Sequence, residues 1–169
     1  RAVAARLAAA LRLRPQGWAR LDATALGQDA VAAAALAQVL RLLSGHEHAP
    51  GAAAVSVLLA RGQGTLHGVQ WRDDILCREP AACAPPVPAL PGACWDGRWR
   101  VRSAPAGAML GALGAAASSL GRRERGGMPA LVLAGLPALW WGERVLGAPG
   151  LGLGAPAELV FAPVGGPLG

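Results

Sequence analysis

The stretch DATALGQDAVAAAALAQVLRLLSG, residues 22–45, decides the N-terminal half of the fold. Its large apolar residues recur at the spacing i, i+3, i+4 and i+7 of one helix face, namely Leu36, Val39, Leu40 and Leu43. Asp22 or Thr24 can cap the start of this helix, and Gly45 can end it. Because an apolar stripe must pack on something, the stretch predicts a helix within a bundle.

Helices are also expected on both sides of this stretch. Residues 1–13 have apolar positions at helical spacing with arginines on the other side, and Pro15 ends the pattern. Pro50 suits the first turn of a third helix that runs to about Ala60. We therefore predict that residues 1–63 form a helical portion with a short-looped helix hairpin.

The apolar periodicity changes from helical to alternating at residue 64, in GTLHGVQWRDDILCR, residues 64–78. Asp73 and Asp74 lie in a polar turn between the two alternating runs, so residues 64–79 predict a β-hairpin, with His67 on a sheet face. Residues 80–92 contain repeated prolines, which exclude a helix or a central strand, and predict a connector.

Residues 93–163 predict a small β-rich portion, followed by a tail, residues 164–169. Its turn at 95–98 leads into a strand at 99–102, residues 138–148 form a hairpin, and residues 158–161 add a strand. The fold class is therefore α+β, helices first and strands after them.

The charge of the chain indicates a polyanionic partner. Its 169 residues include 16 basic and 10 acidic ones, for a formal net charge of +6, and every basic residue is Arg. Guanidinium groups present forked donors that match phosphates, so nucleic acid leads the candidate partners. A GC-rich coding bias would also favour Arg over Lys. No apolar run is long enough to span a membrane.

The candidate RNA contacts combine arginines with neighbouring indoles. Arg98, Arg100 and Arg102 alternate along one predicted strand and would share a face, although a merely solvated face has the same pattern. A Trp beside an Arg can stack on a base, although core packing is the alternative for each indole. The candidates are Arg41, Arg61, Arg72, Arg78, Arg98, Arg100, Arg102, Trp71 and Trp99.

The sequence has no motif for catalysis or metal binding. It contains no phosphate-binding loop with Lys and no nucleophile elbow, so we predict no catalytic residue. The segment 46–48, His-Glu-His, is expected to be a polar turn between helices, not a metal site. Cys77, Cys83 and Cys94 are an odd number at spacings that match no redox or zinc pattern, and predict reduced thiols in a cytoplasmic protein.

Several segments also occur in one consistent order that resembles a known family. They are GWARLD (17–22), ALAQVL (35–40), GTLHGV (64–69), WDGRWRV (95–101), LPALW (136–140) and FAP (161–163). This order resembles the region that follows the catalytic domain of bacterial tRNA(Ile)-lysidine synthases, in the form found among alphaproteobacteria. The similarity spans most of residues 1–163.

The resemblance implies a role in modifying the wobble cytidine of the isoleucine tRNA with a CAU anticodon. In that family ATP, with magnesium, activates the base and lysine displaces AMP. The family's Ser-Gly-Gly-x-Asp-Ser loop is missing here, so its α/β ATP-pyrophosphatase domain is expected upstream of Arg1, and residues 1–169 are expected to be inactive alone.

The expected partners are this tRNA and the chain's own catalytic domain, and a second copy of the chain is a further partner that the sequence leaves open. No cofactor is predicted to bind this part. The alternative is a stand-alone basic module that binds nucleic acid or another protein without catalysis.

Overall fold

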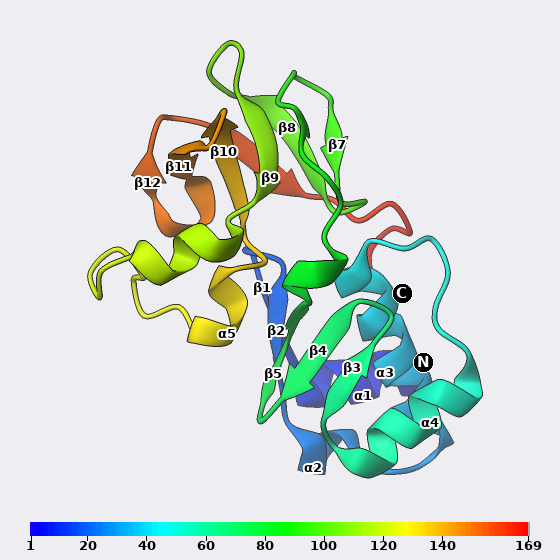
Figure 1. Cartoon of the computed structure of the whole chain (residues 1–169). Coiled ribbons are helices and arrows are strands. Elements are labelled where there is room, and N and C mark those ends of the chain that lie inside the picture. The colour runs from blue at the N-terminus through cyan, green and yellow to red at the C-terminus, as the bar shows by residue number, and fades with distance from the viewer. Residues whose placement is uncertain (169) are drawn as a thin grey trace. The chain divides into compact units, whose positions relative to one another are not determined.

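The computed structural model describes residues 1–168 and is a mixed α+β structure, in which N-terminal helices are followed by antiparallel sheets (Figure 1). This confirms the predicted α+β class, although a strand hairpin at residues 11–21 lies within the portion predicted to be helical. The chain divides into two compact units. Unit 1 contains Arg1–Glu79 and the C-terminal segment from Pro163, and unit 2 contains Pro80–Ala162.

The helices of unit 1 are α1 (Ala2–Ala10), α2 (Ala23–Leu26), α3 (Ala30–Ser44) and α4 (Ala52–Arg61). The predicted apolar stripe is buried along α3, which packs between α1 and α4. Gly45 ends α3 in the left-handed conformation, as expected. The predicted start is wrong, because Asp22 caps only the short α2, and Gly27, with a φ of 79°, interrupts the helix before Asp29 caps α3.

The sheet of unit 1 is antiparallel, in the order β1-β2-β5-β4-β3. Its strands are β1 (Leu11–Arg14), β2 (Trp18–Leu21), β3 (Gly64–Leu66), β4 (Val69–Arg72) and β5 (Ile75–Arg78). The register aligns Ala19 with Leu76 and Leu76 with Trp71. All three are buried, and α3 contacts β4 and β5, so this row of side chains faces the helices.

Two further local predictions in unit 1 are wrong. The first helix ends at Ala10 and not at residue 13, because Leu11–Arg14 pairs with Trp18–Leu21 as a hairpin. Helical periodicity is overridden here by the backbone hydrogen bonds of the sheet. His67 is not on a sheet face but in a tight turn, with a φ of 59°. The predicted turn at residues 73–74 is confirmed between β4 and β5.

Unit 2 contains two antiparallel sheets, in the orders β12-β11-β10-β9-β6 and β13-β8-β7. The first holds β6 (Val87–Pro88), β9 (Met109–Ala112), β10 (Pro137–Trp141), β11 (Arg144–Ala148) and β12 (Leu153–Gly154). The second holds β7 (Cys94–Trp95), β8 (Trp99–Ser103) and β13 (Glu158–Phe161). The core of unit 2 includes Trp95, Trp99, Leu110 and Leu139.

The hairpin of β10 and β11 and the strand at residues 158–161 are as predicted. A short helix, α5 (Ala130–Leu133), lies between β9 and β10. Two features differ from the sequence-based expectations. β9 lies in a Gly- and Ala-rich segment without a strand signal, and within residues 80–92 the Val87–Pro88 pair forms the edge strand β6.

A buried arginine attaches the C-terminal segment to unit 1. Arg41 of α3 is buried and its guanidinium donates hydrogen bonds to the carbonyl oxygens of Gly165, Gly166 and Pro167, at 3.3 Å for Gly166 and 3.0 Å for Pro167. Arg41 Nε also lies 3.2 Å from Gln38 Oε1. Since a buried guanidinium needs partners for its N–H groups, the C-terminal segment is part of the structure of unit 1.

We predict that Arg41→Met lowers the free energy of unfolding by about 2 kcal/mol, because hydrogen bonds to a charged group are lost. Urea unfolding measures this. Removal of residues 163–169 should have a similar effect, and combining both changes should cost less than their sum, because both remove the same bonds. Fully additive losses would contradict this role of Arg41.

A second prediction concerns the acid side of the stability curve. Arg6 holds both carboxylate oxygens of Asp29, at 3.1 and 2.9 Å, and the Ala32 N–H donates to Oδ1 at 2.8 Å. The Arg6 hydrogen bond, followed by the backbone one, lowers the pKa of Asp29. The stabilisation is therefore present above the ordinary Asp pKa, and protonation removes it as the pH falls below roughly 4.

Asp29→Asn keeps a capping side chain without this titration. We expect wild type to be the more stable of the two at neutral pH and the difference to shrink in acid. Thermal melts of both proteins at a series of pH values test this. A difference that stays constant in acid would argue against the Arg6–Asp29 pair.

Candidate nucleic-acid interface

The sheet face of unit 1 that points away from the helices carries a row of arginines. The strand register places Arg12 beside Arg20, Arg20 beside Ile75, and Ile75 beside Arg72. This row alternates with the helix-facing row, so its side chains lie on the opposite face of the sheet. Neighbouring strands are roughly 4.8 Å apart. The side chains of Arg12, Arg20 and Arg72 therefore form a row that crosses the four strands β1, β2, β5 and β4.

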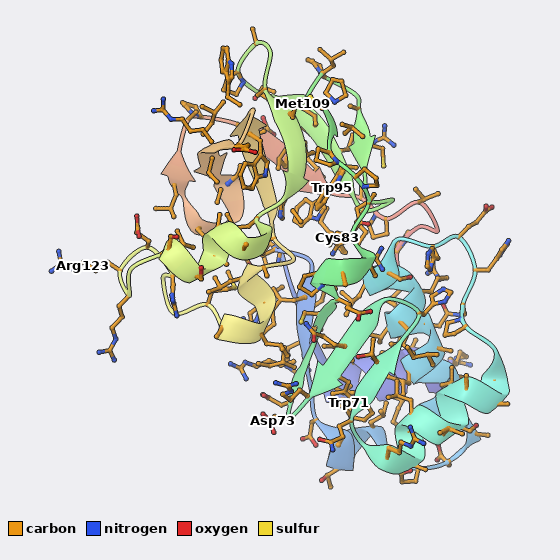
Figure 2. The ribbon with its side chains drawn as sticks, viewed as in Figure 1. Trp71, Asp73, Cys83, Trp95, Met109 and Arg123 are labelled. Carbon is orange, nitrogen blue, oxygen red and sulfur yellow. The ribbon has the colours of Figure 1, made fainter. Side chains whose placement is uncertain are left out.

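A hollow of about 470 Å³ lies at the β3 edge of this sheet, next to Arg72. It is lined by the end of α4, by β3 and by β4, through Arg61, Gln63, Gly64, Thr65, Gln70, Trp71 and Arg72. No acidic residue is among these lining residues. We call it the Arg61–Arg72 hollow. Figure 2 labels Trp71 on β4 and Asp73 at the end of the β4–β5 hairpin.

The local backbone explains why these side chains meet. Gly62 ends α4 in the left-handed conformation, with a φ of 68°, and Gly64 begins β3 with a φ of 138°. These two angles favour glycine and turn the chain back within a few residues. As a result Arg61, the last residue of α4, lies near Arg72, the last residue of β4.

The arginines of this face differ in how their charge is used. Arg20 forms an ion pair with Asp74 at 2.5 Å. Arg12 donates to the carbonyl oxygens of Ala8 and Leu11, both at 2.9 Å. Arg61 and Arg72 are exposed and bond to no group within residues 1–168, so their guanidinium donors face water in the hollow.

Two aromatic–cation contacts flank the same face. Arg14 and Arg20 lie over the ring of Trp18, at 5.8 and 5.6 Å from its centroid. Trp18 is itself buried, so its indole packs against the side chains of Arg14 and Arg20 and exposes little ring surface to solvent. Arg14 remains exposed beside the arginine row.

Three predicted RNA contacts are buried inside the fold. Arg41 binds the C-terminal segment, as described above, and Arg78 Nη1 donates to the Gly68 carbonyl at 3.1 Å. Arg98 is only 1% exposed and its guanidinium meets Asp96 Oδ2, at 2.8 Å from Nε and 2.7 Å from Nη2. These guanidinium groups are buried and bonded within the protein, so an RNA phosphate cannot reach them.

The expectation that Arg98, Arg100 and Arg102 share one face is therefore wrong for Arg98. Asp96 has a φ of 55° and Gly97 a φ of 63°, so Arg98 lies in the turn before β8, where the Asp96 carboxylate holds it. Arg100 and Arg102 are exposed on β8. Arg100 donates to the Gly92 carbonyl at 3.0 Å, and Arg102 lies 3.8 Å from Glu158.

The two predicted stacking residues are inside the molecule. Trp71 is 2% exposed and its Nε1 donates to the Asp73 carbonyl at 3.0 Å. Trp99 is 4% exposed and packs edge to face on Phe161, with centroids 5.3 Å apart. Neither offers an open ring face to a base. Sequence reasoning also missed Gln63, Thr65 and Gln70 in the hollow, since single polar residues carry no signal of their own.

The histidines form a polar contact between the α3–α4 loop and the β3–β4 turn. The rings of His46 and His67 meet edge to face at 4.1 Å, and His67 Nε2 lies 3.0 Å from the carbonyl oxygen of His48. Across the described part of the chain, no three His, Cys, Asp or Glu residues gather as a metal site requires. Cys77, Cys83 and Cys94 form no disulfide within residues 1–168.

Searches of known protein families, of curated proteins and of solved structures found nothing that this chain significantly matches. Among residues 1–168, no helix has both the length and the apolar character needed to cross a bilayer. The candidate interface therefore stands on its geometry and charge.

The contrast between buried and exposed arginines is testable. Arg98→Ala leaves the Asp96 carboxylate buried without its cation, so we predict a loss of about 3 kcal/mol or more in unfolding free energy. Arg100→Ala with Arg102→Ala removes two exposed side chains and should change it by less than about 1 kcal/mol. Chemical denaturation compares them. Equal losses would contradict the distinction.

Proposed function

We propose that unit 1 binds the phosphate backbone of RNA through the Arg61–Arg72 hollow, and that the chain is the tRNA-binding accessory part of a tRNA(Ile)-lysidine synthase. The observation that carries the first statement is the hollow itself, with two unpaired guanidinium groups and no carboxylate on its lining. The family resemblance supports the second.

The chemistry of the lining suits a phosphate. Two guanidinium groups supply charged, forked donors, and the side chains of Gln63, Gln70 and Thr65 add neutral polar groups at the same place. Arg20 and Arg12 continue the row across the sheet. Arg20 is paired with Asp74, and Asp22, Asp73 and Asp74 lie beside both arginines, so the unpaired positive charge of this row lies at the Arg61–Arg72 hollow.

Such contacts position an RNA without reading its sequence. This fits an accessory role, in which unit 1 holds the tRNA while an ATP-pyrophosphatase domain of the same protein modifies the wobble cytidine of the CAU anticodon. ATP, magnesium and lysine would act in that domain, and we assign them no residue here. A tRNA-modifying role of this kind belongs in the cytoplasm.

The double variant Arg61→Ala/Arg72→Ala tests the hollow. We expect weaker binding of a tRNA transcript and a log Kd against log salt plot whose slope falls by about 2, one for each lost phosphate contact. The control is Arg122→Ala/Arg123→Ala, which removes the same charge from an exposed loop of unit 2. Figure 2 shows Arg123 pointing away from the ribbon.

Equal losses in both double variants would indicate general charge attraction and contradict the hollow as the site. The specific role is tested with two anticodon stem-loops, CAU and UAU, offered to the chain together with its catalytic domain. Preference for CAU supports the lysidine reading. Equal binding favours the basic module alternative, and salt-independent binding of one protein partner would overturn RNA binding altogether.

A further inference from the structure

Trp141 differs from the other tryptophans of the chain. Its side chain is 60% exposed, whereas Trp18, Trp71, Trp95 and Trp99 are buried. Its neighbour Trp140 is half-buried and its Nε1 donates to the Ala112 carbonyl at 3.2 Å. An exposed indole leaves a large apolar ring in water, which a fold does not require for its own stability.

The position of Trp141 is well defined by the β10–β11 hairpin. Trp141 pairs with Arg144 across the hairpin, and Gly142 in the tight turn has a φ of 59°. Gly107, in the β8–β9 turn, lies beside the indole. A Cβ atom at this position would be 4.0 Å from the indole Cη2. The ring edge therefore rests beside a residue without a side chain, so most of the ring stays uncovered.

We propose that Trp141 and Arg144 form a binding site for an unpaired nucleobase of RNA. The indole supplies a stacking surface, and the Arg144 guanidinium reaches a neighbouring phosphate or the base itself. Arg144 is exposed and has no hydrogen bond or ion pair within residues 1–168. The site lies in unit 2 and would bind a different chemical feature of RNA. Its test is therefore independent of the test of the Arg61–Arg72 hollow.

The size of the apolar surface favours a base over a protein partner. The large hydrophobic residues of unit 2 with exposed side chains are Leu90 and Trp141 in the described chain. A stable protein interface buries roughly 800 Å² on each partner, with a cluster of apolar anchors at its centre. A nucleobase needs only one open aromatic face and one nearby donor.

One group near this site opposes an anionic ligand. Glu143 lies in the turn between Trp141 and Arg144, is exposed, and brings a carboxylate close to any phosphate bound there. Its charge therefore makes a further readout possible. Glu143→Gln removes the repulsion without changing the size of the side chain, and it should strengthen binding of single-stranded RNA at low salt.

The experiment measures binding of the full chain to two probes, an adenosine hexanucleotide RNA and a blunt RNA duplex. We expect Trp141→Ala to weaken hexanucleotide binding about tenfold and duplex binding less than twofold, because bases inside a duplex are not free to stack. Trp141→Phe should retain most of the affinity. The hexanucleotide should quench wild-type indole fluorescence, and this quenching should be lost in Trp141→Phe.

Leu90→Ala is the control, since it removes the other exposed hydrophobic side chain of unit 2. Unchanged hexanucleotide affinity in Trp141→Ala, or equal loss for both probes, would overturn the proposal. A change of oligomeric state in Trp141→Ala with unchanged RNA binding would overturn it in favour of self-association. Failure of the Arg61→Ala/Arg72→Ala variant to weaken tRNA binding refutes the proposed function and leaves this result untouched.

Discussion

The pairing of β2 with β5 is the interaction on which the architecture of unit 1 depends. It aligns Ala19 with Leu76 and Arg20 with Ile75, and so joins a hairpin near the N-terminus to a meander that follows three helices. Without it the helix-facing row of the sheet would stop at the edge of β5. The same register fixes Arg20 and Arg72 on the opposite face, so core and candidate interface follow from one alignment.

The arginines of the chain divide into two populations with different physical roles. Arg41, Arg78 and Arg98 are buried, and each is held by carbonyl or carboxylate oxygens. A planar guanidinium can satisfy several acceptors at once, which makes it suited to such positions. The exposed Arg61, Arg72 and Arg144 instead keep their donors available for a ligand. A net charge of +6 therefore overstates the charge available to RNA.

How far the sequence predicted the structure depended on the range of the interactions involved. The α3 stripe and the turns at residues 73–74 and 142–143 are local signals, and the structure has them. Residues 11–13 were predicted as helix because the pairing that makes them part of β1 is tertiary. β9 carries few side chains with a strand preference and is defined by its neighbours β10 and β6. Among the predicted RNA contacts, the alternating pattern of residues identified the strand that follows Arg98. The direction of the Arg98 side chain depends on the turn at Asp96, which the pattern does not reveal.

Two separate kinds of contact on one chain would give an RNA ligand more than either alone. Phosphate contacts in the Arg61–Arg72 hollow would supply affinity that weakens as the salt concentration rises and does not depend on the base sequence of the RNA. A stacked base at Trp141 would supply a contact that depends little on salt and requires an unpaired nucleotide. Because both sites lie on one chain, an RNA long enough to reach both would form the second contact at a raised effective concentration once the first has formed. Such an RNA, with a phosphate backbone and an accessible unpaired base, would be selected over a plain duplex even though each contact is weak.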